Sequence, residues 1–126
     1  MAEIELGDNT IIISETDAKG NITFANDDFI RISGYIWEEL VGKPHNILRH
    51  PDMPKIAFKD LWETVKAGQT WNGFVKNKTK QGDFYWVYAT VSPVKTDQGE
   101  LRYISVRTKP TRQEIEKYDS HYKTLH

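Results

Sequence analysis

The sequence predicts an α+β domain in which a five-stranded antiparallel sheet carries short helices on one face. Two short β-branched or aromatic stretches lie near the start of the chain and three long ones near its end, with helical spacing between them. Short turns containing glycine join each long stretch to the next, as is typical of antiparallel neighbours. Helices placed between the two groups of strands are expected to pack on the sheet.

The amino-terminal half holds two expected strands and two short helices. The three isoleucines at 11–13 are typical of a buried strand, and the turn at 17–20 returns the chain into a second strand. Asn26, or the aspartate after it, caps a short helix that Gly34 ends, and a further helical turn ends at Gly42. The expected strands cover 10–15 and 21–25.

The carboxy-terminal half predicts a longer helix, three strands and a final helix. Pro54 begins the longer helix and Gly68 ends it. Pro110 ends the last strand, and Thr111 with Glu114 has the spacing of a capping box for the final helix. The final helix carries a heptad-like seam made of Ile115, Tyr118, Tyr122 and Leu125. The three expected strands cover 70–78, 84–94 and 101–109.

Composition excludes several classes of function. A chain of 126 residues is long enough for one domain with its own core. The net charge of −1 provides no overall basic field for nucleic acid or anionic lipid, and the lack of cysteine excludes disulfides and thiolate chemistry. No apolar run reaches membrane-spanning length and no signal peptide is visible, so we expect a soluble cytoplasmic module.

One short stretch concentrates polar chemistry between two prolines. Arg49, His50 and Asp52 fall within four positions, and Pro51 and Pro54 hold the backbone around them in non-helical conformations. The stretch is either a rigid turn with a local pair between Arg49 and Asp52 or the corner of a binding site. The stretch by itself leaves the two interpretations equally weighted.

Several motifs resemble those of PAS sensory domains, namely Ala25-Asn26-Asp27 and Ser33-Gly34-Tyr35 followed by Glu39-Leu40-Val41-Gly42. A second set is similar to the PAS domain of the Aer-type aerotaxis receptors. This set comprises the run from Pro44 to Pro54 with its His-Pro-Asp-Met-Pro segment, Trp71-Asn72-Gly73, Val75-Lys76-Asn77 and Tyr85-Trp86-Val87. The resemblance covers about residues 8–125.

The resemblance implies a PAS fold that holds non-covalent FAD and acts as a redox sensor rather than an enzyme. In that family the flavin redox state reports on respiration, and the signal reaches a chemotaxis histidine kinase through HAMP and methyl-accepting regions. We therefore expect an amino-terminal cap over 1–9, a sensor domain over 10–110 and a linker helix over 111–126. A homodimer is also implied, in a receptor anchored in the inner membrane whose PAS domain stays in the cytoplasm.

Five of the expected FAD contacts are amide or aromatic side chains, Asn26, Phe58, Trp71, Asn77 and Tyr85. Strand alternation puts Trp71 and Asn77 on one inward face, where a buried amide needs partners that a flavin ring would supply. Asn77 has the alternative of bonding the hairpin backbone at the end of its strand. Asn26 also fits a helix N-cap, and the three aromatic residues also fit an ordinary apolar core.

The resemblance places His45, Arg49, His50 and Asp52 at the flavin as well. Arg49 has a guanidinium suited to the FAD pyrophosphate, while His50 and Asp52 are expected to bond the ribityl or adenosine portion or to orient Arg49. His45 stands near the position where LOV domains, the light-sensing flavin members of the fold, carry their adduct-forming cysteine. Because the chain lacks cysteine, that photochemistry is excluded.

Arg107 is the last expected contact. Strand alternation puts it on one face with Tyr103 and Ser105. By the resemblance, it falls where LOV domains place a glutamine beside the reactive flavin edge, and we expect it to stabilise negative charge on the reduced flavin. The alternative is a salt bridge on the exterior of the sheet, since charged residues usually avoid cores.

Strand alternation predicts a second apolar surface on the opposite face of the sheet. Its side chains are Phe74, Trp86, Tyr88, Ile104 and Val106. A monomer rarely leaves so much apolar area exposed, so we expect the amino-terminal segment, a second subunit or a downstream domain to cover it. A solvated strand edge is expected at Lys76, Lys78 and Lys80.

Two other functions fit the same fold, a haem-based gas sensor and a cofactor-free PAS dimerisation module. The longer helix, where many haem-binding PAS domains place their axial histidine, contains no histidine, which disfavours haem. Hydrolysis by His50 and Asp52 is disfavoured because no nucleophile or metal constellation accompanies them.

Overall fold

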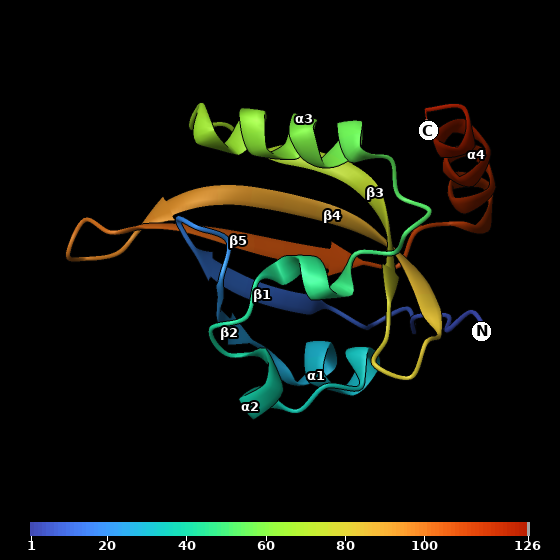
Figure 1. Ribbon diagram of the computed structural model, residues 1–126, viewed down its shortest axis with the longest axis horizontal. Coiled ribbons are helices and arrows are strands. Elements are labelled where there is room, and N and C mark those ends of the chain that lie inside the picture. Colours follow the sequence, from blue (N-terminus) through green and yellow to red (C-terminus); the bar gives the residue numbers. More distant parts are fainter. Residues whose placement is uncertain (126) are drawn as a thin grey trace.

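The computed structural model describes residues 1–125 and contains one five-stranded antiparallel sheet (Figure 1). Its strands are β1 (Ile12–Asp17), β2 (Ile22–Ala25), β3 (Trp71–Lys78), β4 (Phe84–Lys95) and β5 (Leu101–Thr108). They lie in the order β2-β1-β5-β4-β3, so the meander of the last three strands joins the first hairpin through β5 and β1. The predicted fold class is confirmed.

Four short elements connect β2 to β3. They are α1 (Asp27–Ser33), α2 (Trp37–Leu40), the 3-10 helix η1 (His45–Leu48) and α3 (Lys55–Lys66). Helix α3 lies along β3 and β4, whereas α1 lies beside β1 and α2 beside β2 (Figure 1). A final helix, α4 (Arg112–Lys123), follows β5. No helix within residues 1–125 combines the length and the apolar character needed to cross a membrane.

The caps that local sequence predicts are present. Asn26 Oδ1 accepts a hydrogen bond from the backbone N–H of Phe29 at 3.0 Å, and Gly34 ends α1 with a φ of 79°. Thr111 and Glu114 form the reciprocal capping box of α4. Strand β1 begins at Ile12 rather than at the expected position 10, because side chains of α1 and its cap, not a neighbouring strand, bond the backbone of Ile11.

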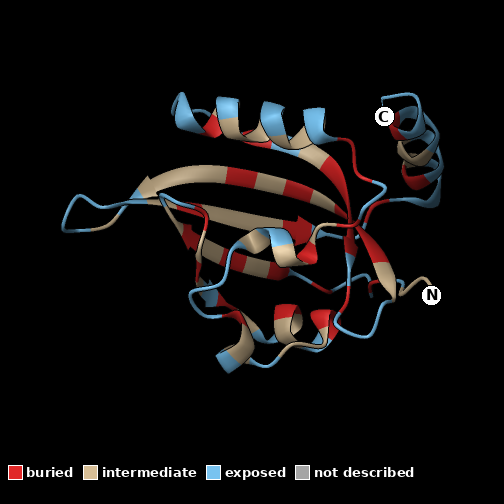
Figure 2. Cartoon of the chain, viewed as in Figure 1, coloured by how far each residue is buried: buried red, intermediate tan, exposed pale blue. Residues whose placement is uncertain are grey.

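The core lies between the inner face of the sheet and the helices that connect its halves. Inward side chains of the strands, such as Ile12 and Tyr85, meet Phe29 of α1, Leu48 of η1 and Val65 of α3, all nearly inaccessible to solvent. Buried residues alternate with less buried ones along β1 and in the middle of β4, as Figure 2 shows. This packing fixes which strand positions face the helices.

Helix α4 covers part of the outer face of the sheet. The ring of Tyr118 stacks on Phe74 at 4.4 Å between centroids, and Tyr122 stacks on Trp86 at 6.1 Å. The Tyr122 hydroxyl also donates to the carbonyl of Phe74 at 2.6 Å. The seam predicted on the final helix therefore packs on its own sheet, and α4 must be added to the occupants expected for this face.

The amino-terminal segment also packs on the domain. The backbone N–H of Ile4 donates to the carbonyl of Phe84 at 2.8 Å, and Leu6 is 3% exposed. Arg112, at the start of α4, bonds the carboxylates of Glu3 and Glu5. The segment thus links the start of β4 to the start of α4.

The predicted lysine edge is only partly solvated. Lys78 is exposed, but Lys76 is 9% exposed and its Nζ lies 2.7 Å from Asp52 Oδ2. Lys80 pairs with Glu39 of α2. The expectation was wrong for Lys76, because residues 49–54 wrap around the edge of β3 and cover its ammonium group.

Candidate ligand-binding site

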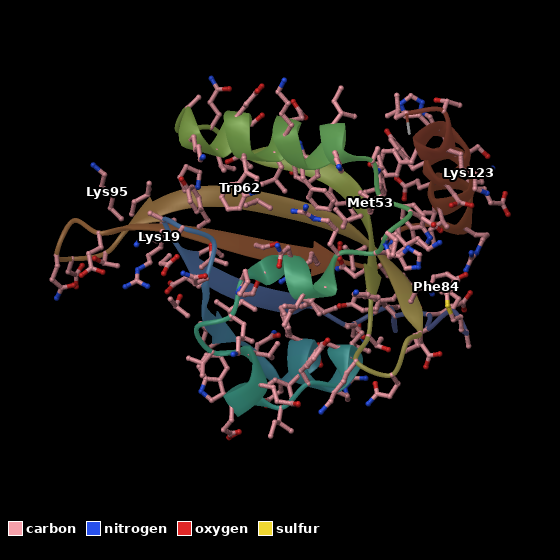
Figure 3. All side chains as sticks on the ribbon, viewed as in Figure 1. Lys19, Met53, Trp62, Phe84, Lys95 and Lys123 are labelled. Atoms are coloured by element: carbon pink, nitrogen blue, oxygen red, sulfur yellow. The ribbon has the colours of Figure 1, made fainter. Side chains whose placement is uncertain are left out.

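A cavity of about 230 Å³ lies between the inner face of the sheet and helices η1 and α3. Trp62 projects from α3 towards the sheet and meets the ring of Tyr103 at 5.4 Å, edge to face (Figure 3). The walls supplied by the helices and loops are Lys19, Gly20, Pro44, His45, Asn46, Arg49, Phe58, Leu61 and Trp62. The floor supplied by the sheet is Ser14, Thr16, Val75, Asn77, Ala89, Val91, Tyr103, Ser105 and Arg107.

Short side chains on adjacent strands leave this space open. Ser14 of β1 lies directly opposite Ser105 of β5, and Ala89 of β4 lies directly opposite Arg107. Larger residues at these inward positions would fill the cavity as they fill the rest of the core. Sequence reasoning put Ser105 on the same face as Arg107 but did not expect Ser14, Ala89 or Ser105 to line a cavity. Their signal is a small residue at an inward position of each central strand.

Arg107 and Ser14 on the floor form a hydrogen-bonded network with His45 on the wall. Arg107 Nη1 lies 3.1 Å from His45 Nε2, and Arg107 Nη2 donates to Ser14 Oγ, which itself lies 3.1 Å from His45 Nε2. Because a guanidinium can only donate, His45 Nε2 must accept, and the ring proton of neutral His45 resides on Nδ1. The Ser14 hydroxyl, which accepts from Arg107, then donates to Nε2.

Burial controls the charges in this network. Burial, followed by the positive charge of Arg107, lowers the pKa of His45 from 6.5 to about 3, so the imidazole is neutral at pH 7. Burial also lowers the pKa of Arg107 from 12.5 to about 10, which leaves the guanidinium charged. Within residues 1–125, Arg107 takes part in no ion pair with a carboxylate. The floor therefore presents a buried positive charge that is not neutralised.

A second cation enters from the opposite wall. The guanidinium of Arg49 lies over the ring of Phe58 at 3.7 Å, and its backbone forms a β-bridge with Asn77. Burial lowers the pKa of Arg49. No Asp or Glu is among the lining residues, so the cavity favours an anionic ligand or one with many acceptors.

Several buried polar atoms of the lining have no hydrogen-bond partner within the described chain. They are Thr16 Oγ1, Arg49 Nε, Asn77 Nδ2 and Arg107 Nε. Leaving such groups unpaired costs free energy, so their presence in one cavity points to a ligand that supplies acceptors. Three of these atoms can only donate, and they belong to residues that the sequence marked as contacts.

The predicted contacts divide into two groups. His45, Arg49, Phe58, Asn77 and Arg107 line the cavity. The remaining five do not line it, and each has another structural role.

Three of those five belong to the fold around the cavity. Asn26 caps α1 and ties it to β1, because its Oδ1 also accepts from Ile13 N at 3.0 Å. Trp71 donates its indole N–H to Asp60 of α3 at 2.8 Å. Tyr85 is 1% exposed, directly opposite Asn77, and burial raises its pKa.

His50 and Asp52 lie at the edge of β3 rather than in the cavity. His50 is 7% exposed, its Nδ1 accepts from the backbone N–H of Asp52 at 3.0 Å, and its ring meets Phe84 edge to face. Burial lowers the pKa of His50, with Lys76 as the next cause. Asp52 pairs with Lys76, and neither His50 nor Asp52 lines this cavity.

Comparisons with known proteins agree with this architecture. The PAS fold family model matches residues 22–107. The chain is 48% identical over 120 residues to the aerotaxis receptor of Escherichia coli (strain K12), covering 95% of this chain and 24% of the receptor. It is 34% identical over 94 residues to the nitrogen fixation regulatory protein of Klebsiella pneumoniae, covering 75% of this chain and 19% of that protein. The chain thus spans less than a quarter of either relative.

Solved structures share the fold at low identity. The blue-light photoreceptor Aureochrome1 LOV in its dark structure superposes with a TM-score of 0.71 at 19% identity, covering 90% of this chain and 80% of that chain. A light-oxygen-voltage domain studied with a flavin analogue gives a TM-score of 0.72 at 18% identity, covering 92% and 87%. The family match covers β2 to β5 and the helices between them, which supply all of the cavity lining except Ser14, Thr16, Lys19 and Gly20, and we conclude that the chain belongs to the PAS fold family.

Proposed function

We propose that the chain is the FAD-binding redox input domain of an aerotaxis or energy-taxis transducer. The observation that carries the proposal is the cavity floor, where the buried charge of Arg107 faces an uncharged His45 and no carboxylate. The identity to the aerotaxis receptor of Escherichia coli supports the placement within a taxis system. The chain exchanges electrons through its ligand and catalyses no reaction.

The lining fits a flavin. An isoalloxazine ring presents several acceptor oxygens and nitrogens at one edge, and the unpaired donors of Arg107 and Asn77 match that edge. Phe58 and Trp62 offer faces and edges to a flat ring. Arg49 is the cation suited to the diphosphate of FAD, because its guanidinium can bond two phosphate oxygens at once.

The residues of the chain supply the electrostatics of sensing. A bound flavin supplies reversible uptake of electrons. Arg107 stabilises negative charge at the ring, because its own charge is buried and held without a competing carboxylate. His45 and Ser14 fix the guanidinium in place through the network on the floor.

Strand β5 carries Arg107 and leads through Pro110 directly into α4. A shift of the guanidinium towards or away from the ring would therefore move β5, the strand that precedes the final helix. The packing of α4 on the outer face is the element that such a shift would bias. We place a homodimer contact and the downstream HAMP and methyl-accepting regions after α4, in a receptor held at the inner membrane with this domain on its cytoplasmic side.

The absorption spectrum of the purified chain 1–126 tests the proposal. Flavin bands are expected, and denaturation should release FAD, identified by chromatography and mass. If the chain is purified without ligand, added FAD should restore the bands. A Soret band would instead assign a haem sensor, and failure to bind any chromophore would assign a cofactor-free interaction module.

A further inference from the structure

The corner, residues 49–54, pairs with the free edge of β3. Arg49 forms an antiparallel β-bridge with Asn77, and the backbone N–H of His50 donates to the carbonyl of Lys76 at 3.4 Å. Strand β3 is the last strand on its side of the sheet, so this edge would otherwise present unpaired backbone groups. The corner thus extends the sheet by a short additional segment.

Lys76 contacts the corner through three of its groups. Its carbonyl accepts from His50, its backbone N–H lies 3.3 Å from Met53 Sδ, and its Nζ lies 2.7 Å from Asp52 Oδ2. Its ammonium group also lies 4.5 Å from the centre of the Phe84 ring. Met53 and Phe84, labelled in Figure 3, mark this end of the sheet.

Alternation along both segments separates two environments. Arg49 and Asn77, which face each other across the bridge, both line the cavity. Lys76 and His50, one position along each segment, are buried against Phe84 instead. The contacts on the Phe84 side therefore set where Arg49 stands on the cavity side, although they do not reach the cavity.

The two partners of the ion pair between Asp52 and Lys76 differ in solvent exposure. The Lys76 side chain is 11% exposed, whereas that of Asp52 is 56% exposed. Removing the carboxylate leaves a nearly buried ammonium group without this partner, while removing the ammonium leaves a carboxylate that water can solvate. Lys76→Met also keeps an unbranched apolar side chain beside Phe84. It therefore disturbs the packing less than a substitution of Asp52, which would leave the ammonium group buried without this partner.

We propose that Lys76 and Asp52 are positioning residues that hold the corner on β3 and thereby place Arg49 in the cavity beside Asn77. The proposal rests on the proposed function for its ligand, because Arg49 is the cation assigned to the flavin phosphates. The pair then sets the affinity for flavins that carry phosphate, while the ring site formed by Arg107, His45 and Asn77 remains intact. Riboflavin, FMN and FAD separate the two contributions.

The test measures dissociation constants of riboflavin, FMN and FAD for the chain 1–126 and its variants. Lys76→Met is expected to weaken FMN and FAD about tenfold and riboflavin less than about twofold, as for loss of one charge-assisted contact. Arg49→Gln should show the same pattern. The double variant should bind FAD no more weakly than Arg49→Gln alone, because both changes remove the same contact.

Lys78→Met is the matched control, since it removes an equal charge from the same face of β3 at an exposed position. It is expected to leave all three affinities unchanged. Equal weakening of riboflavin and FAD by Lys76→Met, or multiplied losses in the double variant, would overturn the positioning role. Lys76→Arg keeps the positive charge, so its FAD affinity should be closer to that of the wild type than to that of Lys76→Met. An FAD affinity as weak as that of Lys76→Met would count against the positioning role.

Hydrogen exchange of the unliganded chain tests the same role without a flavin. In Lys76→Met, the amides of the corner should exchange about tenfold faster than in the wild type, while those of α1 stay unchanged. Unchanged exchange at the corner would overturn the inference. Failure of the wild type to bind any flavin would instead overturn the proposed function. The hydrogen-exchange result would still decide whether Lys76 holds the corner on β3.

Discussion

Arg107 Nη1 lies 3.1 Å from His45 Nε2, although 62 positions separate the two residues in the chain. The contact places a buried, charged guanidinium beside an imidazole that stays neutral at pH 7. It also joins β5, which leads to α4, with η1, which forms one wall of the cavity. The contact therefore connects the cavity wall to the strand that precedes the final helix.

Arg107→Ala should make the flavin midpoint potential more negative. The guanidinium favours the form of the ring with more negative charge, and its removal takes away that stabilisation. A loss of about 1.4 kcal/mol corresponds to about 30 mV for a two-electron couple. Reductive titration against a reference dye measures the shift.

Arg31→Ala provides the control for Arg107, because Arg31 is an exposed residue of α1 that pairs with Asp28. Its midpoint potential should equal that of the wild type. An unchanged potential in Arg107→Ala would show that Arg107 does not tune the ring.

The stability of the domain should depend on pH through His45. Its folded-state pKa of about 3 lies below the usual 6.5, so the unfolded chain binds a proton that the folded chain does not. This contribution to stability is present above pH 6.5 and is lost as the pH falls towards 3. Between pH 7 and pH 5 the loss of unfolding free energy from this group amounts to about 2 kcal/mol.

His45→Gln should remove that part of the pH dependence. Urea unfolding of both proteins at pH 7 and pH 5 gives the slope of the unfolding free energy against pH for each protein. His121→Gln, at an exposed position of α4, is the control and should retain the wild-type slope. Identical slopes for His45→Gln and wild type would contradict the buried neutral imidazole.

Gly73→Ala should destabilise the domain by about 1–3 kcal/mol, as for overpacking of a core. A Cβ at position 73 would lie 2.3 Å from the ring of Trp71, and the hydrogen bond to Asp60 restrains that ring. Thermal or urea unfolding measures the loss. In a Trp71→Val background the same change should cost much less, and an undiminished cost there would rule out the ring as the cause.

Tyr122→Phe should destabilise the docking of α4 by about 1 kcal/mol, the usual value of one buried hydrogen bond. The lost bond is the one from the hydroxyl to the carbonyl of Phe74, and burial raises the Tyr122 pKa to about 12. Tyr118→Phe is the matched control, because Tyr118 contacts Phe74 through its ring. Equal losses in the two variants, measured by urea unfolding, would contradict this difference.

Local signals in the sequence predicted the helices and strands well. Asn26, Gly34 and the pair Thr111 and Glu114 act through neighbours a few positions away, so their geometry follows from spacing. The strand alternation that put Asn77 and Arg107 on inward faces is likewise a local property, and both line the cavity.

Contacts that depend on strand register could not be predicted in this way. The cavity arises because Ser14 meets Ser105 and Ala89 meets Arg107, and these pairings bring together distant segments. The burial of Lys76 depends on the corner wrapping the edge of β3, which no periodicity in β3 encodes. His50 and Asp52 share a short motif with Arg49 but face the other side of that edge.

Titration of the ligand-free chain with FAD, with Ser105→Phe alongside the wild type, tests whether FAD binds in the cavity. Ser105 lines the cavity from β5, the central strand of the sheet, so a phenyl ring there is expected to fill the space while leaving the strand intact. We expect one FAD bound per wild-type chain, with quenched flavin fluorescence, and no binding to a Ser105→Phe chain whose circular dichroism is unchanged. Equal binding of FAD to both folded chains, or to neither, would show that the cavity is not the flavin site.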